Sequence, residues 1–224
     1  MYEKLFDKKR QEDMRSFFLN ELAPLGLIRN CYKNEVIDID SSNYICIVTE
    51  GKFKQILCDA SGNEKVMFFL IPGEIFGETC YFVNGDMPVL LKSCCVSKVS
   101  LLERSILDDF ISKNPGAYEF FIHSLVRKYR ISVTQMHDML FTSAKQKIAN
   151  TLYRLSIQSG IEMSGYIVID IKLTHQELAN LIGSSRITVT RILKELKEDN
   201  IVDATPDKKF IIKNIDRLKE FIQI

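Results

Sequence analysis

The spacing of apolar and polar residues changes along the chain, and in the first half of the chain it predicts strands. Between Val36 and Arg104, short apolar or alternating runs are separated by glycine, proline and asparagine, which is typical of an antiparallel barrel or sandwich. The predicted strands are Ile45 to Val48, Phe53 to Cys58, Lys65 to Leu70, and the segment Val89 to Leu102. The predicted turns lie at Gly51, Ser61 to Asn63, Pro72–Gly73 and Asn84–Gly85.

From Asp108 onward the spacing becomes helical. Apolar residues recur at alternating intervals of four and three, at Ile122, Val126, Tyr129, Val133, Met136 and Leu140. This heptad pattern is the one by which two helices pack along each other. The alternative is a single amphipathic helix that lies on its own barrel.

A segment near the C-terminus predicts two helices joined by a tight turn. Thr174 and Glu177 have the spacing of a capping box, which marks the start of the first helix. Gly183 stands where the chain must reverse with a left-handed backbone, which glycine adopts at least cost. Ser184 or Ser185 can then cap the second helix.

The second helix has one apolar and one polar face. The residues predicted to be buried are Val189, Ile192, Leu193 and Leu196. The residues predicted to face outward are Arg186, Thr188, Thr190 and Arg191. A short helix with arginines and hydroxyls in its first turns suits the major groove of DNA. An ordinary helical hairpin with a solvated face would account for each of these residues taken alone. It does not account for the caps, the glycine and the arginines occurring together at these spacings.

Strands are predicted on both sides of this helix pair. Tyr166 to Ile171 is a strand candidate before it, and Ile201 to Ala204 and Phe210 to Ile212 form a hairpin after it. Lys208 and Lys209 lie at the hairpin tip, where they can reach phosphate. A helix-turn-helix flanked by strands is a winged helix.

Composition adds limits to this interpretation. The chain has 224 residues, 46% hydrophobic and 26% charged, which is enough for two modest domains. Its net charge is only +1, although lysines and arginines outnumber acidic residues by 13 to 10 from Phe141 onward. DNA affinity is therefore expected to depend on local charge placement and on doubling by dimerisation. Since no signal peptide or membrane span is recognisable, we expect a cytoplasmic protein with reduced cysteines and no membrane partner.

Longer stretches resemble a known family. LTHQELANLIG followed by SSRITVTRILKELKEDNIV resembles the DNA-binding domain of the Crp/Fnr transcription regulators, and VTEGKFKQ, SGNEK and IPGEIFGETCYFVNG resemble the cyclic-nucleotide-binding-type barrel of the same family. The resemblance implies an α+β fold with three parts. These are an effector-sensing antiparallel jelly-roll barrel (1–111), a dimerisation helix (112–140) and a winged-helix DNA-binding domain (141–224).

The resemblance also implies which residues contact DNA. Arg186 and Arg191 stand where the family's recognition helix carries arginines, and an arginine can bond guanine O6 and N7 together. The whole expected DNA-contacting set is Thr174, His175, Gln176, Ser185, Arg186, Ile187, Thr188, Thr190 and Arg191. Ile187 departs from the pattern, because many members carry glutamate there, as an acceptor for cytosine. Isoleucine packs instead against a thymine methyl group, so we expect no demand for a G·C pair at that step; a regulator of halogenated-aromatic respiration within the family also has an apolar residue here.

The sensor half departs from the cyclic-nucleotide pattern. Gly77–Glu78 match the family's G-E pair, but its phosphate-binding arginine and hydroxyl positions fall on Pro88 and Val89. A buried phosphate would lack a cation, so cAMP is not the expected effector. A small organic effector is expected near Gly77, Glu78, Thr79, Val89, Tyr129, Ser132 and Val133. Lys92 and Lys128 are the candidate partners of an acidic ligand.

Other chemistry has little support. The cysteines are scattered at Cys31, Cys46, Cys58, Cys80, Cys94 and Cys95, without the spacing of a cluster, so no metal or cofactor is expected. They serve either as apolar filler or as a thiol redox switch. No nucleophile motif is present, and we do not expect an enzyme.

The sequence therefore predicts a homodimeric, effector-controlled transcription regulator that binds an inverted repeat and, by family resemblance, RNA polymerase. A redox-controlled or effector-independent regulator remains an alternative, as does, more remotely, a cyclic-nucleotide-binding module without a DNA role.

Overall fold

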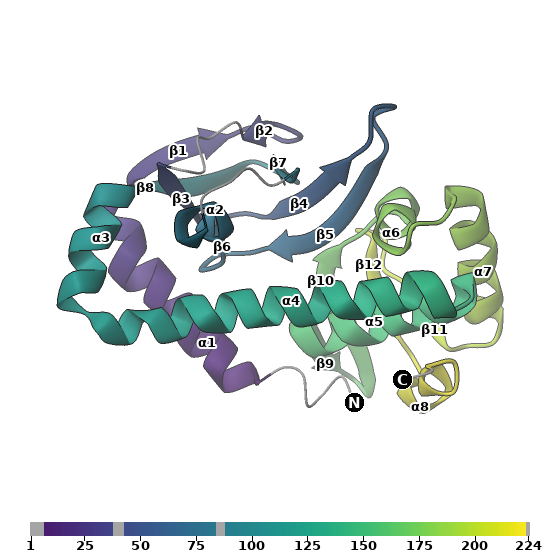
Figure 1. Cartoon of the computed structure of the whole chain (residues 1–224). Coiled ribbons are helices and arrows are strands. Elements are labelled where there is room, and N and C mark those ends of the chain that lie inside the picture. Colours follow the sequence, from purple (N-terminus) through teal and green to yellow (C-terminus); the bar gives the residue numbers. More distant parts are fainter. Residues whose placement is uncertain (1–6, 38–42, 84–87, 223–224) are drawn as a thin grey trace. The chain divides into compact units, whose positions relative to one another are not determined.

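Two antiparallel sheets form the first half of the computed structural model, which describes residues 7–37, 43–83 and 88–222 (Figure 1). One sheet has the order β1 (Leu27–Cys31), β8 (Ser97–Glu103), β3 (Tyr44–Glu50) and β6 (Ile75–Phe76). The other has the order β2 (Val36–Ile37), β7 (Leu90–Ser93), β4 (Phe53–Cys58) and β5 (Glu64–Leu70). The predicted antiparallel barrel is confirmed, and its four-stranded sheets follow the jelly-roll plan.

The strand prediction differs from the structure at several places. The segment Val89 to Leu102 is two strands, because the chain turns at residues 94–96 between β7 and β8. The short strands β1, β2 and β6 were not predicted; β1 carries the exposed apolar residues Leu27 and Ile28, so it lacks a clean alternation. The predicted turn at Asn84–Gly85 lies outside the described residues.

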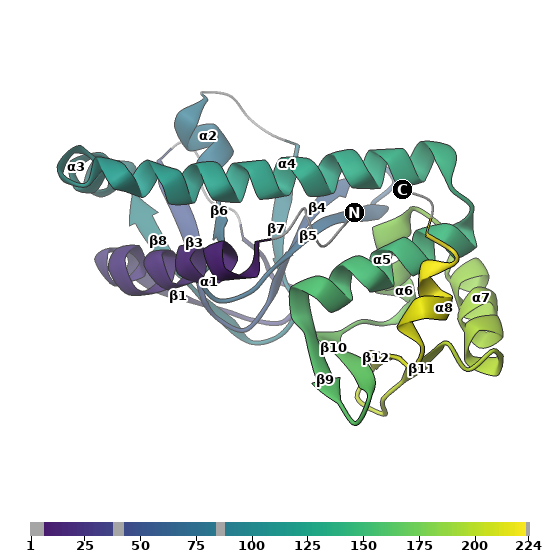
Figure 2. The same ribbon diagram turned by 90° about the horizontal axis from the view of Figure 1, so that it is seen from below.

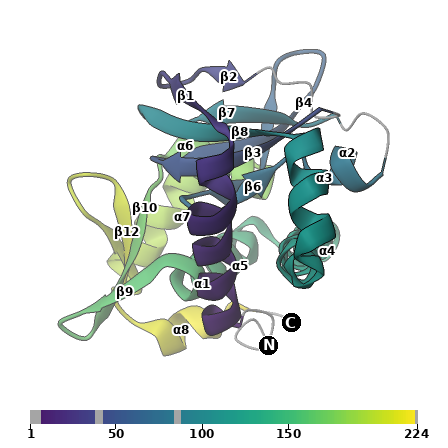
Figure 3. The same ribbon diagram turned by 90° about the vertical axis from the view of Figure 1, so that its left-hand side faces the viewer.

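Three helices pack against one of these sheets (Figure 3). They are α1 (Lys8–Phe17), which runs on into a π-helical turn at Phe18–Leu22, α2 (Glu78–Phe82) and α3 (Arg104–Lys113). Their shared core includes Phe18, Ile47 and Phe121, each at most 1% exposed. Burial of these side chains stabilises the unit by about 1.5–3 kcal/mol each, relative to leaving them in water.

A buried carboxylate joins α1 and the following long helix to the barrel. Glu74, which is 2% exposed, precedes β6. Its Oε1 accepts hydrogen bonds from Arg15 at 2.7 Å and from Arg127 at 2.6 Å, and Arg127 is itself 8% exposed. Burying these charges is costly, so they are stable here only as a hydrogen-bonded group.

The helix α4 (Tyr118–Phe141) is the longest of the described helices (Figure 2). It begins at Tyr118 rather than near residue 112, because Asn114 ends α3 and Pro115–Ala117 forms a 3-10 turn. Proline cannot continue the hydrogen bonding of α3, which explains the break. The chain divides into two compact units within α4, one of residues 7–130 and one that contains Ile131 onward.

The second unit is a helical domain with one small sheet. Its helices are α5 (Ala144–Ser159), α6 (His175–Ile182), α7 (Arg186–Glu198) and α8 (Ile215–Lys219). Its strands lie in the order β11 (Val202–Ala204), β12 (Lys209–Ile212), β10 (Tyr166–Lys172) and β9 (Gly160–Met163). Thus the predicted helix-turn-helix, the strand before it and the hairpin after it are all present. None of the helices in the described part of the chain has the length and apolar character to cross a membrane.

Glu74 offers a test of how this first unit is held together. We expect Glu74→Ala to lower the free energy of unfolding by about 3–5 kcal/mol, because it leaves Arg127 buried without its anion. The matched control is Glu119→Ala, whose exposed side chain meets the exposed Arg10 at 3.4 Å and should matter little. Urea unfolding followed by circular dichroism measures both variants. Equal stability of the two variants would contradict this account of the buried cluster.

Candidate nucleic-acid interface

The first helix of the pair starts and ends as its sequence dictates. Thr174 and Glu177 form a reciprocal capping box, in which the Glu177 amide donates to Thr174 Oγ1 at 3.1 Å and the Thr174 amide donates to Glu177 Oε2 at 2.8 Å. The helix α6 ends at Gly183, whose φ of 64° and ψ of 48° are left-handed. A residue with a β-carbon is strained in this conformation, so glycine permits the tight turn to α7.

The second helix is capped by Ser185 rather than Ser184. The Ser185 hydroxyl oxygen accepts from the Thr188 amide at 3.1 Å, while its backbone is extended, as an N-cap requires. The cap fixes where α7 begins and therefore which side chains lie in its first turn. The first turn starts with Arg186, directly after the cap.

The faces of α7 follow the predicted division. The buried residues are Val189, Ile192, Leu193 and Leu196. The exposed ones include Arg186, Ile187, Thr190 and Arg191, whereas Thr188 is half-buried. Ile187 is 83% exposed, which is unusual for an isoleucine in a helix that has an apolar core to pack against. This side of α7 therefore combines charged, hydroxyl and apolar groups at the surface.

The hairpin of β11 and β12 is tied to the start of α6. The Leu173 amide donates to the carbonyl oxygen of Lys208 at 2.9 Å, and Lys208 has a left-handed φ of 68°. The two lysines predicted at the tip differ, because Lys209 pairs with Asp170 at 2.5 Å, and Lys208 instead lines a notch beside α6. Lys208 is thus the better placed of the two to contact an anion.

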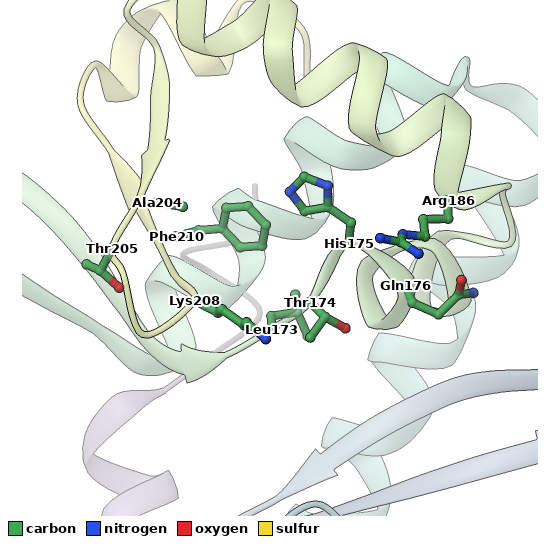
Figure 4. Close-up of a pocket in the computed structure, with 9 residues that line it drawn as sticks. All are labelled: Leu173, Thr174, His175, Gln176, Arg186, Ala204, Thr205, Lys208 and Phe210. Atoms are coloured by element: carbon green, nitrogen blue, oxygen red, sulfur yellow. The ribbon is translucent and has the colours of Figure 1, made fainter.

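The notch lies between the hairpin, α6 and α7, and has a volume of about 440 Å³ (Figure 4). Its lining residues are Leu173, Thr174, His175, Gln176, Arg186, Ala204, Thr205, Lys208 and Phe210. Leu173 and Phe210 are buried apolar residues, and the lining also includes the cations Arg186 and Lys208. Four of the predicted DNA-contacting residues, Thr174, His175, Gln176 and Arg186, thus meet at one hollow.

Electrostatics distinguish the two arginines of α7. Arg191 pairs with Glu195 on the next turn at 2.8 Å, although both side chains are exposed and such a pair is weak. Within the described part of the chain, the Arg186 side chain makes no hydrogen bond or ion pair. Burial and the nearby Arg186 charge lower the pKa of His175 below its usual value, which favours the neutral imidazole. Arg186 is therefore available to an incoming anion or base.

The residues of the predicted heptad seam all lie exposed on α4. Ile122, Val126, Tyr129, Val133, Met136 and Leu140 are between 41% and 69% exposed in the single chain. Six apolar side chains in one row on a solvent-facing helix are costly to leave uncovered. Ile122, Val126 and Tyr129 belong to the same compact unit as the barrel and are exposed, so this part of the seam does not pack on it.

The residues proposed for the sensor site have different surroundings. Gly77 has a left-handed φ of 98° and begins α2, and Glu78 is 2% exposed and pairs with the buried Lys128 of α4. Lys92 pairs with Glu64 at 2.5 Å. Both lysines expected to meet an acidic ligand are therefore paired with glutamates of the same chain. The remaining proposed residues include exposed ones at Thr79, Tyr129 and Val133 and half-buried ones at Val89 and Ser132.

The cysteines are free thiols in unlike environments. Cys31 and Cys46 are buried, and burial raises the pKa of both thiols, so they remain protonated and unreactive. Cys58 and Cys95 are exposed. No group of three or more metal-binding side chains gathers among the described residues.

Two protein-family models match this chain. The model of the cyclic nucleotide-binding domain matches residues 36–114, and that of the Crp-like helix-turn-helix domain matches residues 146–221. Together the two matches cover more than half of the chain. The chain belongs to the Crp/Fnr family of transcription regulators.

Individual Crp/Fnr relatives agree with this assignment. The CRP-like cAMP-activated global transcriptional regulator of Mycobacterium tuberculosis is 26% identical over 149 residues, which span 66% of this chain and 66%, just under two thirds, of that protein. The cAMP-activated global transcriptional regulator CRP of Salmonella typhimurium is 27% identical over 70% of this chain and 75% of its own length.

Solved structures agree on the fold. A CooA mutant from Carboxydothermus hydrogenoformans superposes with a TM-score of 0.79 at 16% identity, covering 93% of this chain and 94% of its own. CprK complexed with OCPA gives 0.72 at 19% identity, over 90% and 92% of the two chains. The c-di-GMP responsive regulator CLP of Xanthomonas campestris gives 0.69 at 21% identity, over 93% and 100%. These structures therefore share the fold of this chain.

Proposed function

We propose that this chain is a homodimeric, sequence-specific DNA-binding regulator that reads an inverted repeat with α7. The observation that carries the proposal is the exposed face of α7. It presents Arg186, Ile187, Thr190 and Arg191 on a helix whose opposite face is buried. A helix of this kind fits the major groove, where arginines bond guanine and apolar groups contact thymine methyls.

Phosphate contacts follow from the groups around that face. Ser185 and Thr174 carry hydroxyls at the starts of α7 and α6, and His175, Gln176 and Lys208 line the adjacent notch. Contacts of this type position a protein on the duplex without reading sequence. The notch is the proposed seat of a backbone phosphate, because Arg186 and Lys208 supply positive charge to it.

The exposed seam of α4 supports the homodimer. Two copies that pair their seams bury the apolar row and bring two recognition helices together. The helices must lie about 34–36 Å apart to engage half-sites one DNA turn apart. An effector then acts by shifting the population between dimers that meet this spacing and dimers that do not.

The proposed effector is a small molecule other than cAMP. Pro88 and Val89 occupy the positions where the family's nucleotide pocket has its arginine and hydroxyl residue. Glu78 already has a buried partner in Lys128, so the G-E pair has a structural role in this chain. RNA polymerase is the further partner that we propose on the basis of family membership.

Selection from random duplex DNA at moderate salt, with and without reductant, tests the DNA function. We expect enrichment of a two-fold symmetric site, and we expect Arg186→Ala to lose at least about tenfold in affinity for it, since each bidentate arginine contributes about 1–3 kcal/mol of discrimination. Arg217→Ala is the control, because its guanidinium bonds the carbonyl oxygen of Asp199 within the domain. A protein that neither enriches a sequence nor binds duplex DNA in a salt-dependent way contradicts the proposal.

The dimer is tested at the seam itself. Met136→Glu places a charge in the row and should convert the dimer to monomer in sedimentation experiments, because burial of an unpaired carboxylate is costly. Arg130→Glu also introduces a carboxylate, at an exposed position off the seam, and should leave the dimer intact. Persistence of a Met136→Glu dimer would show that another surface pairs the chains.

Ile187 is tested by restoring an acceptor. In Ile187→Glu we expect the base preference at one symmetric position to move toward G·C by about tenfold, since glutamate accepts a hydrogen bond from cytosine N4. Ile187→Val keeps the apolar contact and should keep the wild-type preference. Unchanged preference in the glutamate variant would refute the assigned contact.

A further inference from the structure

A side-chain contact across the two helices links the notch to the DNA-reading face. His175 Nδ1 lies 2.9 Å from Thr190 Oγ1, although the two residues are 15 positions apart and belong to α6 and α7. The His175 ring also lies nearly parallel to that of Phe210, with an interplanar angle of 14° and centroids 6.4 Å apart. Because Phe210 is only 3% exposed, its ring is a fixed surface beside His175. Three elements therefore set the position of one imidazole.

The imidazole has two kinds of neighbour. Nδ1 contacts Thr190, which is exposed on the outer face of α7. His175 also lines the notch, together with Arg186 and Lys208 (Figure 4). A phosphate bound in the notch would lie beside the ring, and it would accept hydrogen bonds but donate none. A ring nitrogen directed at it must carry a hydrogen to form a favourable contact.

The protonation state limits how both contacts are made. Burial and the positive charge of Arg186 lower the pKa of His175 and favour the neutral ring, which carries a single N–H. If Nε2 carries that hydrogen toward a phosphate, Nδ1 is an acceptor. Thr190 must then donate its hydroxyl hydrogen to Nδ1, and only the lone pairs of Oγ1 remain for DNA.

We propose that His175 is a positioning residue that fixes Thr190 as a hydrogen-bond acceptor toward the DNA, so that Thr190 selects a base with an exocyclic amino group in the major groove. This inference rests on the proposed DNA-binding function. Adenine N6 and cytosine N4 are the major-groove donors, whereas guanine O6 and thymine O4 are acceptors. Left to itself, a threonine hydroxyl rotates to donate or accept and does not distinguish these two classes.

The expected signature is a preference for adenine or cytosine over guanine or thymine at one position in each half-site. One neutral hydrogen bond sets its size at about fivefold. Thr190→Val identifies the position, because it removes the hydroxyl while keeping the shape of the side chain. Thr190→Ser keeps the hydroxyl and should keep the preference.

His175→Phe tests the coupling. Phenylalanine retains a flat ring beside Phe210 but has no atom that accepts a hydrogen bond. We expect the preference at the Thr190 position to fall from about fivefold to less than about twofold, while thermal unfolding stays unchanged. The control is Gln176→Ala, which removes another notch residue whose amide bonds Asn180 rather than Thr190. It should weaken binding to all sequences without changing the preference.

The double variant His175→Phe/Thr190→Val separates coupling from a direct effect of His175. We expect it to have the same base preference as Thr190→Val alone. The inference is overturned if His175→Phe keeps the full base preference, or if Thr190→Val changes the preference at no position. It is also overturned if His175→Phe lowers the preference equally in the presence and in the absence of the Thr190 hydroxyl. If the wild-type chain enriches no sequence at all, the proposed DNA function fails first. Enrichment of a site without the coupling overturns only the role of His175.

Discussion

The reversal of the chain at Gly183 is the constraint on which the DNA-reading surface depends. The left-handed glycine ends α6, and the Ser185 cap two residues later begins α7, so the local backbone decides which residues form the first turn of α7. The helix that begins there buries Val189 and Leu193 and leaves the first exposed turn to Arg186 and Ile187. The same turn brings Thr190 to His175, and the hairpin backbone, tied to Leu173, places Phe210 beside the histidine ring.

The barrel unit depends on a different kind of interaction. Two glutamates, Glu74 and Glu78, lie on either side of β6 and each bonds a buried cation from α4, Arg127 and Lys128 respectively. The pairs hold the first half of α4 on one rotational face, because adjacent cations point into the barrel unit. The apolar seam then faces outward by helical periodicity. The buried ion pairs within one chain thus orient α4 so that the seam proposed for pairing with a second chain is exposed.

Much of this was predictable from local sequence patterns. Capping residues, the turn glycine and the spacing of apolar residues predicted the helix pair and the hairpin, since each depends on residues close in sequence. Other features depend on distant partners. Nothing near Lys128 indicates that Glu78 binds it, and nothing near His175 indicates Thr190 or Phe210. The start of α4 at Tyr118 was signalled by Pro115, but the helical spacing from Asp108 onward obscured it. Whether the predicted DNA-contacting residues touch DNA still depends on the proposed function.

The central claim is that one dimer places two copies of α7 on two half-sites that lie one helical turn apart. Its most direct measurement is equilibrium binding to the symmetric duplex obtained by selection, compared with a duplex in which about five base pairs are inserted between the half-sites. The insertion turns one half-site to the opposite side of the helix. The account predicts tight binding of two chains to the first duplex and a loss of at least about a hundredfold on the second, toward the affinity for non-specific DNA. Equal affinity for both duplexes would contradict it.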